Sequence, residues 1–224
     1  VLVSRLIGLS QIYFPMFEEK LAKYELPLEL KYLAIVESAL NPNAISKSGA
    51  GGLWQFMYPT GKMYGLEVNS YVDDRRDPLK ATEAACRYFK YLYGMFGDWQ
   101  MVLAAYNCGP GTLSKAIRRS GNKKTYWEIR PYLPVETQGY VPAFIAVNYL
   151  MNFTKEHNIY PIAAKQSYFY ADTVHAKQAF TFEAVSQTID IPMEDLIFLN
   201  PAYKLKRVPG YGNYRHLYLP SNKT

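Results

Sequence analysis

Apolar residues recur at helical spacing through about the first 155 positions of the chain, and this pattern constrains the fold more than any other feature. Boundary signals divide the region into separate helices. Asp77-Pro78 is typical of a helix start, whereas Asn41-Pro42 and Gly109-Pro110-Gly111 are typical of helix ends. We therefore predict that residues 1–160 form a mainly α-helical domain.

The last part of the chain has a different character. An aromatic, β-favouring run covers residues 167–174, and residues 217–220 are typical of a closing strand. Two short helical patterns lie between them, over residues 182–188 and 192–200. The order strand, helix, helix, strand predicts a small α+β domain over residues 161–224.

The composition excludes several classes of protein. The chain has 224 residues, of which 49% are apolar, so it can bury a sizeable core, yet it has no run of about 18 apolar residues that would predict a transmembrane helix. The net charge of +6 is not gathered into a block of Lys and Arg, so we expect no nucleic-acid partner, while an anionic polymer stays open as a partner. The sequence shows neither an initiator Met nor a signal peptide, so we expect the natural chain to begin upstream of Val1.

The chain has two cysteines, Cys86 and Cys108, which supply neither a disulfide framework nor the spacing of a zinc site. They fall on neighbouring predicted helices, so a single bridge and two free thiols are both open. We expect two free, partly buried thiols.

One glutamate, Glu37, has an unusual position in the segment 27–38, which we predict to be helical. At 100° per residue, Glu37 falls in the middle of an apolar stripe formed by Leu30, Leu33 and Ala34. A solvated carboxylate rarely points in that direction. Because burial disfavours the charged form, it raises the pKa of a carboxyl group and keeps the group protonated near neutral pH. Glu37 is therefore a candidate general acid.

Four segments together form a recognisable pattern: Glu37-Ser38, residues 49–57 (Gly-Ala-Gly-Gly-Leu-Trp-Gln-Phe-Met), residues 105–111 (Ala-Tyr-Asn-Cys-Gly-Pro-Gly) and residues 136–142 (Glu-Thr-Gln-Gly-Tyr-Val-Pro). In this order they resemble the soluble-lytic-transglycosylase family, and within it most of all the membrane-bound type D branch. The resemblance covers roughly residues 20–155 and implies a lysozyme-like helical catalytic domain.

The resemblance implies a reaction and a place in the cell. In the family, one glutamate protonates the glycosidic oxygen between N-acetylmuramic acid (MurNAc) and N-acetylglucosamine (GlcNAc) and then acts as a base, while the C6 hydroxyl of MurNAc attacks. The product is a 1,6-anhydro sugar, and no metal or other cofactor takes part. The expected partner is the glycan strand of peptidoglycan. The expected protein is a monomer in the periplasm of a Gram-negative bacterium, associated with the outer membrane by a lipid anchor upstream of the chain shown.

The same resemblance implies roles for residues around the catalyst, Glu37. It implies a substrate-binding set that supplies hydroxyl, amide and thioether groups: Ser38, Ser46, Gln55, Met57, Tyr106, Asn107 and Tyr140. Ser46 would lie near the N-acetyl group of the substrate, and Tyr140 would form a hydrogen bond in the catalytic centre. Glu136 would support the site without acting as a nucleophile. Cys108 departs from the family, which usually has a small residue such as Ala there.

Several of these positions also have a simpler interpretation. Ser38 could merely end a helix, Met57 could belong to the core, and Trp54 is expected to pack in the interior more than to bind sugar. Glu136 is expected to be structural, since an acidic residue near a helix start is favoured by the helix dipole. The charged segment 73–77 (Asp-Asp-Arg-Arg-Asp) is predicted to be a solvated, ion-paired turn.

The C-terminal segment resembles a LysM domain, a βααβ fold that binds glycans containing GlcNAc. The resemblance rests on residues 173–174, 182–191, 196–201 and 217–220. The Gly-Asp-Thr-Leu opening that is usual in LysM domains is absent, and the insert over residues 203–215 is long. Two roles stay open: binding of glycan, or packing against the catalytic domain alone.

Two alternatives to a transglycosylase stay open. A hydrolase of the goose-lysozyme type would need a second carboxylate to place a water molecule, and the motif segments offer only Glu136. A catalytically inactive glycan-binding protein would not need Glu37 together with Gln55, Tyr106 and Asn107. The sequence does not distinguish endolytic from exolytic cleavage.

Overall fold

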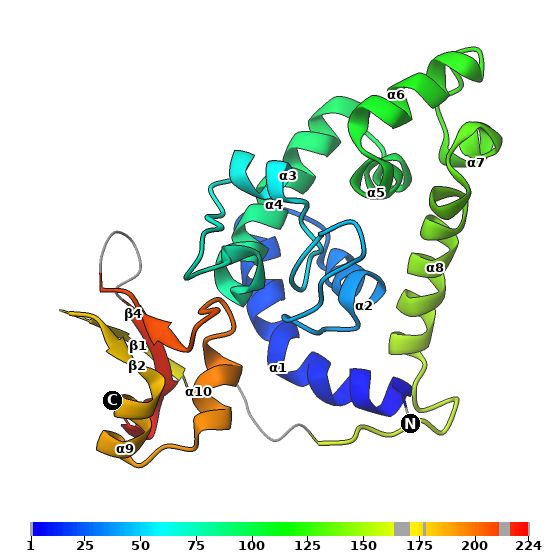
Figure 1. Ribbon diagram of the computed structural model, residues 1–224. Coiled ribbons are helices and arrows are strands. Elements are labelled where there is room, and N and C mark those ends of the chain that lie inside the picture. Colours follow the sequence, from blue (N-terminus) through cyan, green and yellow to red (C-terminus); the bar gives the residue numbers. More distant parts are fainter. Residues whose placement is uncertain (1, 164–170, 177, 211–215, 224) are drawn as a thin grey trace.

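The computed structural model describes residues 2–163, 171–176, 178–210 and 216–223. A larger helical body carries a smaller module of short strands and helices on one side, with helix α8 on the opposite side of the body (Figure 1). This arrangement confirms the predicted fold class: mainly α, with a small α+β module at the C-terminal end. The segment that follows α8 contacts the start of the first helix, where Ile162 N donates to Ser4 O at 2.9 Å.

The helical body contains α1 (Leu2–Lys23), η1 (Leu28–Tyr32), α2 (Leu33–Ser38), α3 (Tyr58–Met63), η2 (Asp74–Arg76), α4 (Pro78–Phe96), α5 (Trp99–Cys108), α6 (Pro110–Arg119), α7 (Tyr126–Ile129), η3 (Arg130–Tyr132) and α8 (Val135–Asn152). Helix α5 is the central element, because residues 101–105 are all buried and the helix packs against α4, α6 and α8. Apolar side chains from α1, α2 and α4 complete one continuous core.

The predicted helix start at Asp77 is confirmed, and a second acidic residue, Asp98, begins the next helix in the same way. The Asp77 carboxylate accepts hydrogen bonds from the backbone N–H groups of Leu79 and Lys80, both at 2.9 Å, and Asp98 caps α5 through the N–H of Met101 at 2.9 Å. Each carboxylate satisfies donors that the first turn of a helix leaves without an intrahelical partner. These caps fix where α4 and α5 begin, and α5 carries two of the predicted site residues.

The segment before Glu37 differs from the prediction of a single helix over residues 27–38. It forms the 3-10 helix η1 and then the six-residue helix α2, which ends at Ala39 with a φ of 52°. A 3-10 turn holds the chain by i to i+3 bonds, as in Leu30 N to Pro27 O at 3.2 Å. Leu33 and Ala34 nevertheless precede Glu37 by four and three residues within α2, so the three share one face of the helix.

The C-terminal module contains β1 (Ala171–His175), β2 (Phe180–Thr181), α9 (Phe182–Ile189), α10 (Met193–Leu199), β3 (Arg207–Val208), β4 (His216–Pro220) and η5 (Ser221–Lys223). The outer strands and the two helices follow the predicted order, and in the structure β1 and β4 pair antiparallel, with Thr173 opposite Tyr218. A second short ladder joins β2 to β3, which was not predicted. Residues 167–170 of the predicted first strand and residues 211–215 of the predicted insert lie outside the described residues.

The charged segment 73–77 corrects the sequence prediction. It was expected to be solvated, but Asp73, Asp74, Arg75 and Asp77 are buried, with Asp77 only 2% exposed. The predicted ion pairing is present: Arg75 pairs with Asp73, and Lys80 pairs with Asp74, both at 2.8 Å. Burial of charged groups is tolerated here because each has a charged or hydrogen-bonded partner.

Cys86 and Cys108 are both free, as expected, with Cys86 buried and Cys108 partly buried. Within the part of the chain that the structure describes, no helix is both long enough and apolar enough to span a membrane.

Candidate active site

A cavity of about 620 Å³ lies where α2, the loop over residues 46–57, the end of α5 and the start of α8 meet. Its lining includes all of the predicted site residues except Ser38, and it consists of Val36, Glu37, Ser46, Ser48, Ala50, Gln55, Phe56, Met57, Thr60, Tyr88, Tyr106, Asn107, Cys108, Gly109, Glu136 and Tyr140. The four sequence motifs, which are far apart in the chain, thus surround one cavity of a size typical of ligand sites.

Glu37 lies at one end of α2 and is largely enclosed by protein. Burial raises its pKa to about 7, while the hydrogen bond from the Tyr140 hydroxyl lowers the pKa and the negative charge of Glu136 raises it. A carboxyl group with a pKa near neutrality can both give and take a proton at physiological pH. Glu37 therefore has the chemistry of a general acid and base.

Tyr140 reaches Glu37 from the second turn of α8 and donates its hydroxyl proton to Oε1 of the carboxyl group. Burial, together with the nearby charge of Glu37, raises the pKa of Tyr140 well above its ordinary value. The phenol consequently stays protonated and remains a donor throughout the physiological range. Tyr140 binds Oε1 and not the other carboxyl oxygen, so this bond fixes the orientation of the carboxyl group.

Tyr106 contributes its side chain to the wall of the cavity, and its hydroxyl is already engaged in a hydrogen bond within the protein. Its hydroxyl donates to the backbone oxygen of Trp54 at 2.7 Å, and its ring contacts the rings of Phe56, Tyr88 and Phe89. Burial raises the pKa of Tyr106 well above its ordinary value, so its hydroxyl also stays protonated.

The loop over residues 46–57 is held in shape by its own side chains. The Ser46 hydroxyl accepts from Ala50 N at 3.0 Å and lies 2.9 Å from the hydroxyl of Ser48. Gln55 has a positive φ of 47°, and its Nε2 donates to Ala44 O at 3.1 Å and Gly52 O at 2.8 Å. The amide nitrogen of Gln55 is thus occupied by backbone, and its amide oxygen is the group that it can offer to a ligand.

Met57 directly precedes α3 and is 42% exposed, so it belongs to the cavity surface and not to the core. Asn107 is fixed by α8: its Oδ1 accepts from Thr137 Oγ1 at 2.7 Å, and its Nδ2 donates to Glu136 Oε1 at 3.5 Å. Glu136 is exposed in the first turn of α8, where the helix dipole favours a negative charge.

Two residues lie outside the cavity lining. The Ser38 hydroxyl is 2.9 Å from both Ala34 O and Leu53 O, so it joins α2 to the loop backbone. Trp54 is 1% exposed, donates from Nε1 to Thr82 Oγ1 at 2.9 Å, and packs against neighbouring rings. The prediction that Trp54 packs in the interior is confirmed.

Some cavity residues were not singled out from the sequence. Tyr88 belongs to the apolar stripe of α4, so its sequence pattern is that of a core residue. In the structure it also lines the cavity. Ser48 and Thr60 have no pattern that distinguishes them from other loop or helix-start residues. Among the described residues, no group of three or more His, Cys, Asp and Glu side chains is arranged to hold a metal ion.

Comparison with known proteins agrees with this geometry. Residues 15–129 match the family model described as "Transglycosylase SLT domain", and residues 170–224 match "Lytic transglycosylase MltD, LysM-like domain". The chain is 36% identical over 154 residues to membrane-bound lytic murein transglycosylase D of Escherichia coli, an alignment that covers 67% of this chain and 34% of the relative. The chain thus spans about a third of the length of that relative.

Solved structures show the same fold. The 70 kDa soluble lytic transglycosylase of Escherichia coli superposes with a TM-score of 0.54 at 29% identity, over 64% of this chain and 24% of that protein. The complex of the 70 kDa soluble lytic transglycosylase with bulgecin A gives a TM-score of 0.55 at 27% identity, over the same shares of the two chains.

Proposed function

This chain belongs to the transglycosylase SLT family, and from that premise we propose that it cleaves the β-1,4 bond between MurNAc and GlcNAc in peptidoglycan without consuming water, leaving 1,6-anhydro-MurNAc ends. Glu37 would be the single general acid and base. The observation that carries the proposal is the position of Glu37: an enclosed carboxyl with a pKa of about 7, oriented by Tyr140, in the wall of a cavity of about 620 Å³.

The proposed reaction has two proton transfers through Glu37. In the first, the protonated carboxyl gives its proton to the glycosidic oxygen, the bond to C1 of MurNAc breaks, and GlcNAc leaves with a free C4 hydroxyl. In the second, the carboxylate takes the proton of the C6 hydroxyl while that oxygen attacks C1. Glu37 ends protonated as it began, so neither a water molecule nor a second nucleophile is required.

The remaining residues would bind and orient the sugars. We propose that Ser46, Gln55 and Asn107 supply polar groups to the acetamido and hydroxyl substituents, and that Met57 and Tyr106 supply apolar surface to the pyranose faces. Glu136 would support Asn107, since it accepts a hydrogen bond from that amide. We propose a positioning role for Ser38, because its hydroxyl contacts two backbone carbonyls and does not line the cavity.

We further propose that residues 1–160 act as the catalytic domain and that residues 161–224 act as a LysM-like domain that binds glycan. The Escherichia coli relative is named as a membrane-bound enzyme that acts on murein, and this name supports a role at the cell wall of a Gram-negative bacterium. We propose that the enzyme acts in the periplasm in association with the outer membrane. We propose that the enzyme works as a monomer.

The test compares Glu37→Gln with Glu136→Gln in the release of soluble fragments from purified sacculi. Both carboxyl groups line the cavity, and both substitutions keep the shape of the side chain while removing its acidic proton and its ability to ionise. The proposal predicts that Glu37→Gln loses at least about 1,000-fold in rate. Glu136→Gln should lose far less, because Glu136 supports Asn107 and acts on Glu37 only through its charge. Comparable losses in the two variants would favour a hydrolase that uses both carboxylates.

A further inference from the structure

A buried ion pair lies between the C-terminal module and the candidate active site. Asp73 and Arg75 are 4% and 7% exposed. The Asp73 carboxylate accepts from Nε of Arg75 at 2.9 Å through one oxygen and from Nη2 at 2.8 Å through the other. Such a two-pronged pair has a fixed geometry, so each side chain holds the other in place.

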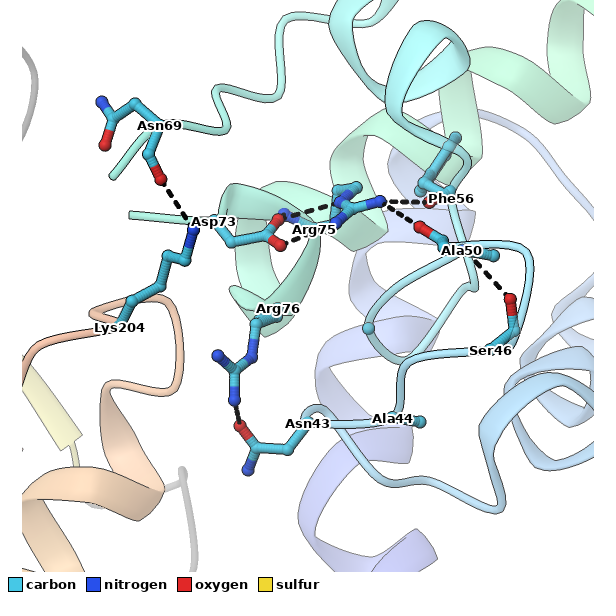
Figure 2. A network of polar contacts seen from close by, with 12 residues as sticks. Asn43, Ala44, Ser46, Ala50, Phe56, Asn69, Asp73, Arg75, Arg76 and Lys204 are labelled. Carbon is cyan, nitrogen blue, oxygen red and sulfur yellow. Dashed lines mark hydrogen bonds and ion pairs between the residues drawn. The ribbon is translucent and has the colours of Figure 1, made fainter. Parts of the chain in front are cut away.

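Arg75 extends from this pair to the loop that lines the cavity (Figure 2). Its Nη1 donates to Gly49 O at 2.7 Å and to Phe56 O at 3.1 Å, so it joins both ends of the segment 49–56. The backbone of Arg75 is equally close: a Cβ atom built on Gly52 would lie 1.6 Å from Arg75 O. The loop can therefore reach its position over Arg75 only because residue 52 is a glycine.

The other side of the pair is bound to the C-terminal module. Asp73 N donates to Ala202 O at 2.9 Å, and Lys204 N donates to Tyr71 O at 2.9 Å. The Lys204 ammonium group also donates to Asn69 O at 2.8 Å (Figure 2). Val72, the residue before Asp73, is fully buried in the apolar core of the module and not in that of the helical body.

The segment 69–75 thus contacts two distant parts of the chain. Its first half is held by the module through three hydrogen bonds and by the burial of Val72. Its second half holds the loop that carries Ser46, Gln55 and Met57 on the cavity surface. Docking of the module can therefore affect the shape of the cavity wall through this segment, without any residue of the module reaching the cavity.

We propose that Asp73 and Arg75 are positioning residues, through which docking of the C-terminal module fixes the loop over residues 46–57 in the shape that binds glycan. The proposal rests on the function proposed above only for its kinetic consequence. The consequence for the structure, a loop that loosens when the pair or the docking is weakened, does not depend on the reaction. The module then has a role in organising the active site in addition to any affinity for glycan.

The first test measures hydrogen exchange of the loop amides in the full chain. Arg75→Lys keeps the charge but cannot maintain all the bonds to Asp73, Gly49 and Phe56, because an ammonium group lacks the planar fork. The matched control is Lys80→Gln, which breaks the neighbouring, partly buried ion pair to Asp74 without touching the loop. We expect the amides of Gly51 and Phe56, which are bonded to each other across the loop, to exchange at least about 10-fold faster in Arg75→Lys and to stay at the wild-type rate in the control.

The second test weakens the docking from the side of the module. Val72→Ala leaves both charged side chains in place and removes apolar contacts only within the core of the module. The same two loop amides are expected to exchange faster, although neither lies in that core. An unchanged rate in Val72→Ala would overturn the part of the proposal that concerns the module, and this variant also carries the test if Arg75→Lys fails to fold.

Kinetic measurements distinguish a positioning role of Arg75 from an effect on the stability of the fold alone. On soluble glycan fragments, Arg75→Lys is expected to raise KM about 10-fold. The basic limb of the pH profile of kcat/KM should stay near its wild-type position, because Glu37 and Tyr140 lie on α2 and α8 and not on the loop that Arg75 holds. A lower activity that only follows the folded fraction, with KM unchanged, would overturn the positioning role. If the wild type cleaves no glycan, the proposed function fails, and hydrogen exchange still decides this inference.

Discussion

The hydroxyl of Tyr140 donates a hydrogen bond to the carboxyl group of Glu37, although the two residues are 103 positions apart in the chain. The bond opposes the effect of burial on Glu37: burial favours the protonated acid, and the bond favours the ionised base. A residue that must be an acid in one step and a base in the next benefits from this balance. The pKa of about 7 is its result.

The first prediction concerns the pH dependence of cleavage. Since Glu37 must be protonated for the first step, kcat/KM should fall as the pH rises through about 7. Tyr140→Phe removes the group that stabilises the ionised form, so the pKa of Glu37 rises further and the basic limb should move to higher pH, together with a fall in kcat. A limb that moves to lower pH in Tyr140→Phe would show that the hydroxyl does not act on Glu37 in this way.

The second prediction concerns stability. The folded-state pKa of Glu37 is about 7, above the value of 4.5 expected in the unfolded chain, so the folded chain holds more protons between these values and loses stability as the pH rises from about 4.5 to 7. Glu37→Gln has no such loss. It should unfold at a temperature roughly 6–12 °C higher than the wild type above pH 7, corresponding to about 3 kcal/mol, and the difference should shrink towards pH 4.

Thermal unfolding followed by circular dichroism measures this difference across the pH range. Glu136→Gln is the control, since Glu136 is exposed and its substitution should change the unfolding temperature little. A Glu37→Gln variant that is less stable than the wild type at pH 8 would contradict the raised pKa of Glu37 in the folded chain.

The third prediction uses a matched pair of glycines. Gly52 has a φ of +83° and no room for a Cβ atom beside Arg75 O, whereas Gly94 lies in α4, where an added Cβ atom would have no neighbour within 4 Å. Gly52→Ala should therefore destabilise the fold by about 3 kcal/mol or more, and Gly94→Ala should leave it unchanged or stabilise it by up to about 1 kcal/mol. Unfolding in urea gives both values, and equal effects would mean that the loop is not held over Arg75 as described.

The sequence placed Glu37 on an apolar helix face for a physical reason that also holds in the structure. Leu33, Ala34 and Glu37 lie within one short helix, so their spacing placed the carboxyl on an apolar face even though the preceding turn is a 3-10 helix. The motif segments likewise placed Gln55, Met57 and Asn107 near Glu37, and all of them line one cavity. Their roles in binding, and the domain boundary near residue 160, stay predictions.

The burial of Asp73 and Arg75 could not be predicted from their own segment. A run of five charged residues has the composition of an exposed turn, and the partners of this pair are backbone carbonyls of residues 49 and 56 and the backbone of residue 202. Backbone groups give no signal in a sequence, so only the folded chain shows that they converge. The same limit applies to Tyr88, whose place on an apolar stripe fits a core residue and a cavity wall equally well.

The most direct test of the central claim is the mass of the products. Purified sacculi are digested with the wild-type chain and with Glu37→Gln, and the soluble muropeptides are analysed by mass spectrometry. The account predicts 1,6-anhydro-MurNAc ends from the wild type and none from the variant, because Glu37 supplies both proton transfers and the C6 hydroxyl replaces water. Reducing ends heavier by one water molecule would contradict it and would make this protein a hydrolase that uses a second carboxylate.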